Sequence, residues 1–172
     1  MYSCYVISVL QYCASVWSPH TIGAKVDVEN IQRNFTRNLG LNSLLGYLDR
    51  ISFIGIHTLA LRRLINDLVL MYKVLNGLVD VEDPGSFVML SKSVTSDRQR
   101  QQTRGHAQKI IKPAFKSNLR KNFWSVRLID CWNKLSPSTI SSSSGRTFKK
   151  SLETVELTKL QTAVGIGFYN KF

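Results

Sequence analysis

The sequence is poor in the residues that mark several protein classes. Its 172 residues include only three cysteines, an odd number, which excludes a small scaffold held together by disulfides. Ten glycines and four prolines exclude collagen-like chains and Pro/Gly linkers. No charged side chain precedes Lys25, yet Ser3, Ser8 and Gln11 interrupt this apolar start. The segment is therefore too short and too polar for a membrane span, and without a basic n-region it does not resemble a secretory signal.

Recognisable catalytic motifs are also absent. The cysteines and histidines are scattered, and no Cys-x-x-Cys or His-x-x-x-His pair occurs that could bind zinc. There is no phosphate-binding Gly-x-x-x-x-Gly-Lys loop and no dinucleotide-binding fingerprint. We therefore expect a protein that is not an enzyme, with no cofactor, no metal ion and no small-molecule substrate.

Acidic residues are scarce in one third of the chain, and this scarcity creates the net charge. Residues 98–150 contain thirteen Lys and Arg but a single acid, Asp130, an excess that equals the chain's net charge of +12. The rest of the chain is balanced. Such a block of one sign favours a polyanion, above all nucleic acid, and less so an acidic membrane or protein. The alternative is a solvated basic surface without a specific partner.

Apolar spacing predicts a mainly α-helical fold, a small helical bundle. We expect helices over about 3–17 (buried and amphipathic), 25–39, 58–76, 119–135 and 147–160. The second would bury Val28, Ile31, Phe35 and Leu39. Residues 91–108 have no apolar period and predict a flexible basic loop, and short apolar runs on either side suggest a short β-hairpin near 87–111.

The helix expected over 119–135 places both of its tryptophans, Trp124 and Trp132, on one apolar arc. They are therefore interpreted as core residues rather than as platforms for stacking bases. Asp130 lies on the other side and can pair with Arg127 or Lys134, which makes these two cations weaker candidates for binding. The basic residues from Arg104 to Arg127, called the basic segment below, supply the expected nucleic-acid contacts: Arg104, Lys109, Lys112, Lys116, Arg120 and Lys121.

Several segments, in order along the chain, resemble the C-terminal region of jockey-like and chicken-repeat-like reverse transcriptases, which belong to non-LTR (LINE-type) retrotransposons. They are residues 10–19 (Leu-Gln-Tyr through Trp-Ser-Pro), 31–37, 59–77, Thr-Arg-Gly-His at 103–106, Arg-Lys-Asn-Phe-Trp-Ser-Val-Arg at 120–127 and Trp-Asn-Lys-Leu-Ser-Pro at 132–137. The resemblance covers about residues 8–152. Ser136 departs from the family's pattern, and the tail after Leu152 matches none of it.

The resemblance implies a thumb-like and post-thumb region that grips RNA or template–primer backbone. It implies a helical thumb-like region over 1–80, an acidic turn and flexible linker over 81–108, a basic helical post-thumb region over 109–160 and an unassigned tail over 161–172. The family's metal-binding aspartates are missing, so no polymerase activity is expected. We expect an intracellular protein, cytoplasmic or nuclear, that does not bind membranes. The alternatives are a degenerate element fragment without function and a secreted basic protein.

Overall fold

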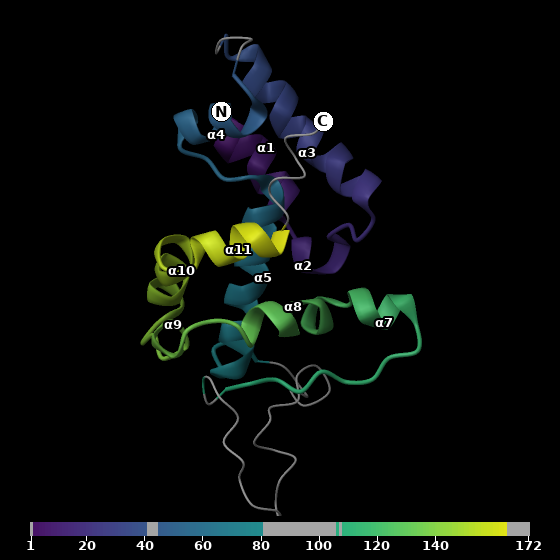
Figure 1. Cartoon of the computed structure of the whole chain (residues 1–172), viewed down its shortest axis with the longest axis vertical. Coiled ribbons are helices and arrows are strands. Elements are labelled where there is room, and N and C mark those ends of the chain that lie inside the picture. Colours follow the sequence, from purple (N-terminus) through teal and green to yellow (C-terminus); the bar gives the residue numbers. More distant parts are fainter. Residues whose placement is uncertain (1, 41–44, 81–105, 107, 165–172) are drawn as a thin grey trace, which may run out of the picture. The chain divides into compact units, whose positions relative to one another are not determined.

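The computed structural model describes residues 2–40, 45–80, 106 and 108–164, and this part of the chain is mainly helical, as predicted (Figure 1). Its helices are α1 (Tyr2–Gln11), α2 (Ala14–Trp17), α3 (Ile22–Asn38), α4 (Tyr47–Ile54), α5 (Leu59–Leu75), α7 (Asn118–Asn122), α8 (Trp124–Trp132), α9 (Pro137–Ile140), α10 (Gly145–Thr154) and α11 (Leu157–Val164). None of these described helices combines the length and the apolarity needed to cross a bilayer.

The predicted hairpin and basic loop fall largely outside the described residues. The expected first strand, at 87–90, lies there, and so does most of the loop over 91–108. At 109–111 the described chain has only a single bridge residue, Ile110, rather than a strand.

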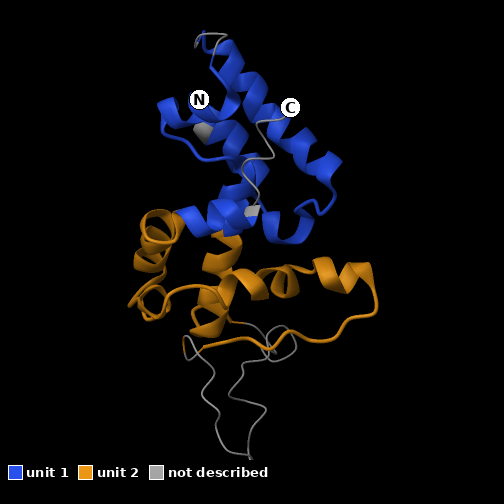
Figure 2. Cartoon of the chain, viewed as in Figure 1, with its two compact units in different colours: residues 1–64, 158–172 blue, residues 65–157 orange. Residues whose placement is uncertain are grey.

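The chain divides into two compact units, which are coloured separately in Figure 2. Unit 1 consists of residues 1–64 and 158–172, and unit 2 of residues 65–157. This division differs from the boundaries at 80 and 108 expected from the sequence, because α5 continues without a break through residue 64 and contributes residues to both units.

Unit 2 is built on the apolar side of α5, as the spacing along this helix predicts. Leu68 and Tyr72 are buried, and the Tyr72 ring stacks on Phe148 of α10 with ring centroids 4.5 Å apart. Phe148 in turn packs against Trp132 of α8 at 5.9 Å. The Tyr72 hydroxyl donates to the Ser142 carbonyl oxygen at 2.6 Å, so the polar end of this ring is also satisfied. Three helices thus share one aromatic core.

Three of the predicted helices are each divided in two, the last of them, expected over 147–160, into α10 and α11. The first breaks near Cys13, which has a left-handed backbone with φ 48°, an uncommon conformation for a residue other than glycine. Phe123, with an extended backbone at ψ 140°, separates α7 from α8. The expectation of a buried first helix is wrong for one face, because Tyr5 and Val9 are more than 70% exposed.

The helix over 25–39 begins three residues earlier than predicted, and its apolar stripe is not the buried face. In α3 the side chains of Glu29, Gln32 and Thr36 are fully buried, while Ile31 is 43% exposed. The prediction failed because periodicity identifies an apolar face but does not detect a polar network inside the protein.

That network connects α3 with α4 and the start of α5. The Glu29 carboxylate accepts hydrogen bonds from the Tyr47 hydroxyl at 2.5 Å and from the backbone N–H groups of Leu59 (3.0 Å) and Ala60 (3.2 Å). The Gln32 amide donates to the Tyr47 hydroxyl and to the His57 carbonyl oxygen, both at 3.0 Å. Glu29 therefore satisfies N–H groups in the first turn of α5 that have no partner within the helix.

Burial raises the pKa of Glu29 above its usual value, and the hydrogen bonds from Tyr47 and Leu59 only partly oppose this effect. A carboxyl group whose pKa is higher in the folded chain binds its proton more tightly there. Its contribution to stability is therefore greatest when it is protonated, and it decreases as the pH rises from about 4.3, the ordinary value, through the raised pKa.

We expect the free energy of unfolding of the wild type, taken relative to the Glu29→Gln variant, to fall as the pH rises above about 4.3, because glutamine does not titrate. Urea unfolding followed by circular dichroism at several pH values measures this difference. Asp27→Asn, which removes an exposed acid from the same helix, is the control. A difference that is constant or increases with pH would contradict the assignment.

Candidate nucleic-acid interface

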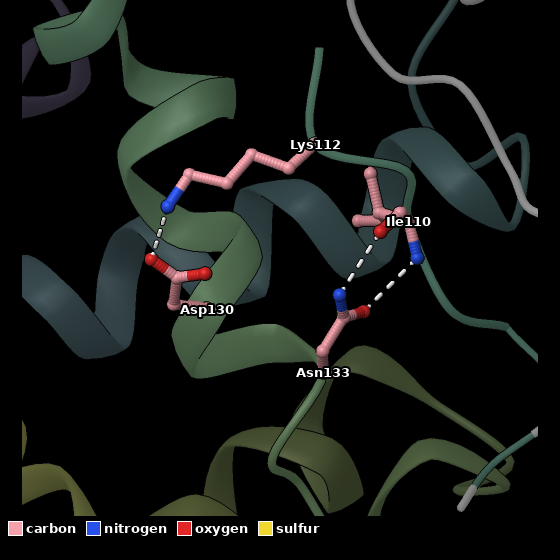
Figure 3. A network of polar contacts seen from close by, with 4 residues as sticks. All are labelled: Ile110, Lys112, Asp130 and Asn133. Carbon is pink, nitrogen blue, oxygen red and sulfur yellow. Dashed lines mark hydrogen bonds and ion pairs between the residues drawn. The ribbon is translucent and has the colours of Figure 1, made fainter. Parts of the chain in front are cut away.

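The described start of the basic segment is held against the end of α8 by one amide side chain (Figure 3). Asn133 accepts a hydrogen bond from the Ile110 N–H at 3.0 Å and donates one to the Ile110 carbonyl oxygen at 2.9 Å. Both backbone groups of Ile110 are therefore satisfied by one side chain, as they would be by a neighbouring strand. The side chain of Ile110 is itself buried, so this point of the segment is fixed by polar and apolar contacts.

Trp132, the last residue of α8, provides two further attachments. Its indole N–H donates to the Gln108 carbonyl oxygen at 2.8 Å, and its own carbonyl oxygen lies 3.1 Å from Nε2 of His106. The two rings also meet edge to face, with centroids 6.3 Å apart. The path of the chain from 106 to 110 is thus determined by contacts with the C-terminal end of α8.

His106 is buried in this arrangement. Burial lowers the pKa of His106 below its usual value, the nearby Lys109 lowers it further, and the contact with the Trp132 carbonyl oxygen opposes the change. The ring is therefore expected to be neutral at pH 7. Its Nε2 carries the hydrogen and donates a hydrogen bond to the Trp132 carbonyl oxygen.

The ion pairs differ from those expected along the helix. Asp130 pairs with Lys112, with Nζ and Oδ2 2.5 Å apart, and both side chains are largely exposed (Figure 3). Arg127 instead pairs with the buried Asp67 of α5 at 2.6 Å. The expectation that Asp130 pairs with Arg127 or Lys134 is therefore wrong: its partner is Lys112. A lysine eighteen residues away in sequence reaches Asp130 because Asn133 holds the segment beside α8.

The six predicted contact residues fall into three groups. Arg104 lies outside the described residues. Lys109 is half-buried, and Lys112 is engaged with Asp130. The remaining three, Lys116 in the loop and Arg120 and Lys121 on α7, are exposed and form no ion pair with a described acid.

These three cations share one stretch of chain. Beyond residue 112 the segment runs beneath α8 in the view of Figure 1 and reverses direction to enter α7. Ser117 begins α7 by accepting a hydrogen bond from the Arg120 N–H at 3.2 Å. The Arg120 guanidinium lies over the Phe123 ring, 5.3 Å from its centroid, which restricts the direction of this side chain. The sequence from 98 to 129 contains no acid, so the local potential is positive.

The interpretation of the tryptophans as core residues is confirmed for Trp132, which has no exposed surface, and Trp124 is half-buried. Sequence reasoning missed Asn133 and Asp67, which position the segment and Arg127. Asn133 follows the apolar arc directly, but nothing in the spacing indicates that its amide would bind backbone.

The described residues offer little for other chemistry. They contain no group of three or more His, Cys, Asp or Glu side chains that could hold a metal ion. Cys4 and Cys13 are exposed free thiols, and burial raises the pKa of the half-buried Cys131. A thiol with a raised pKa is a poor nucleophile.

Comparison of the chain with models of protein families, with curated proteins and with solved structures found no match.

We expect Asn133→Ala to free the start of the basic segment, because the Ile110 N–H and carbonyl oxygen would both lose their partner. An unsatisfied buried backbone group costs about 1–3 kcal/mol. Hydrogen exchange at the Ile110 amide measures the effect and should become much faster. Asn122→Ala, which removes only an exposed side-chain bond to Asn118, is the control. Unchanged protection of Ile110 in Asn133→Ala would show that the amide does not hold the segment.

Proposed function

We propose that this chain is a non-catalytic C-terminal piece of a LINE-type retrotransposon reverse transcriptase, and that it binds RNA or template–primer through its basic segment. The observation that supports nucleic-acid binding is the exposure of Lys116, Arg120 and Lys121, which form no ion pair with a described acid, on a segment whose start is anchored to α8.

The contacts between the segments that carry the resemblance support this proposal. His106 of the Thr-Arg-Gly-His segment packs on Trp132 of the Trp-Asn segment. Arg127, the last residue of the segment at 120–127, pairs with Asp67 of the long helix α5. Residues that depend on one another in one core are expected to occur together in a sequence. Four of the segments that carry the resemblance thus meet in unit 2, as expected if they belong to one domain.

The proposed mechanism is electrostatic. Lysine and arginine side chains neutralise phosphates and release condensed counterions, and this binding does not read base edges. Among the described aromatics of the basic half, Trp132 and Phe148 are fully buried, and Phe115, Phe123 and Trp124 are half-buried, so we expect stacking on bases to contribute less than the exposed cations. Binding should therefore depend steeply on salt and weakly on sequence.

We expect the Lys116→Gln/Lys121→Gln variant to bind nucleic acid more weakly than the wild type, with a salt dependence that is shallower by up to about two units in the slope of log K against log salt. Fluorescence anisotropy with a labelled RNA hairpin, a single strand and a DNA duplex at several salt concentrations measures both effects. Arg120 is left in place because its guanidinium also packs on Phe123.

The control is Arg37→Gln/Lys159→Gln, which removes the same charge from two exposed residues of unit 1. It should bind almost as the wild type does. If the two double variants bind equally well, the basic segment is not the interface. If the wild type itself does not bind, the chain is better regarded as a degenerate fragment that folds without this function.

A further inference from the structure

Unit 2 carries a second set of cations that the predicted interface does not include. Arg146 and Lys150 lie on α10, and Lys73 lies in the last turn of α5. All three side chains are exposed. In Figure 2, α10 and α7 lie at opposite ends of unit 2, so this set is separate from Lys116 and Lys121.

The packing of α10 fixes which of its residues face outward. Phe148 and Leu152 are completely buried and attach one side of the helix to the core. Arg146 and Lys150 are four residues apart and therefore neighbours on the surface of the helix. Lys149 is also exposed, but its ammonium lies 4.0 Å from the Glu153 carboxylate, and this weak pair reduces its share of the surface charge.

Lys73 adds a cation from another helix. Its Cε atom lies 3.8 Å from the position that a Cβ would occupy on Gly145, the first residue of α10. The positive end of the α10 dipole lies at this same terminus. Lys73 of α5 and Arg146 and Lys150 of α10 thus bring positive charge from two helices to the same side of unit 2. No described acid forms an ion pair with any of the three. Such a concentration of positive charge attracts a polyanion.

We propose that Lys73, Arg146 and Lys150 form a second phosphate-binding surface for nucleic acid, and that one sufficiently long molecule contacts this surface and the basic segment together. The chemistry of the partner rests on the proposed function. Nucleic acid fits because a duplex carries about one negative charge per 1.7 Å along its whole length, so it can neutralise two separated cationic surfaces on one unit.

Duplex length distinguishes one surface from two. A unit of about 90 residues is roughly 30 Å across. A duplex of about 8 base pairs, roughly 27 Å long, covers one surface only, whereas one of about 24 base pairs, roughly 80 Å, reaches both. We expect the wild type to bind two short duplexes but one long duplex. Calorimetric titration at low salt gives the stoichiometry, and anisotropy at several salt concentrations gives the affinity.

The Arg146→Gln/Lys150→Gln variant should bind one short duplex, and its affinity for the long duplex should fall about three- to tenfold, with a slope shallower by up to about two. Arg37→Gln/Lys159→Gln again serves as the charge-matched control and should behave as the wild type. Both substitutions on α10 replace exposed side chains, so we expect the fold to be retained, and circular dichroism of each variant tests this.

The outcomes separate this inference from the proposed function. If the wild type binds one short duplex and Arg146→Gln/Lys150→Gln matches the control, the second surface is refuted and the basic segment stands. If Arg146→Gln/Lys150→Gln weakens binding but Lys116→Gln/Lys121→Gln does not, the second surface stands and the proposed contacts are wrong. If neither duplex binds to the wild type, both proposals fail.

Discussion

The indole of Trp132 is completely buried, and its single N–H must find an acceptor within the protein because water cannot reach it. The acceptor is the Gln108 carbonyl oxygen, and the carbonyl oxygen of Trp132 itself is contacted by His106. On its other side the ring packs against Phe148. One residue thus joins the aromatic core of unit 2 to the basic segment. The position of the segment follows from satisfying the polar groups around this ring.

Buried carboxylates play a matching part at the starts of helices. Glu29 accepts from the first N–H groups of α5, and Glu156 accepts from the Ser136 N–H, just before α9, at 2.9 Å. Both side chains are completely buried. An ionised carboxylate is costly to bury, and several donors are needed to offset that cost. Glu29 therefore caps the start of α5 directly, whereas Glu156 holds Ser136, whose hydroxyl caps α9 by accepting from the Thr139 N–H.

Periodicity predicted the parts of the fold in which apolar burial alone decides the structure. The long helix α5 and its buried Leu68 and Tyr72 follow from spacing, and so does the burial of Trp132. Spacing failed where polar contacts decide: the face of α3 that holds Glu29 is buried although it is polar. It also failed for Asp130, since the choice of Lys112 as partner depends on tertiary structure.

The same distinction applies to the candidate interface. Composition locates the positive charge within residues 98–150, but it treats all thirteen cations alike. The structure separates them by their neighbours: Arg127 stabilises the fold through Asp67, whereas Lys116 and Lys121 face solvent. A cation already engaged with a buried acid gains little from a phosphate, because the pair would first have to be broken. A nucleic acid would therefore be bound mainly by the exposed cations. The backbone that leads to them is already anchored at Ile110, so binding would have to order chiefly their side chains.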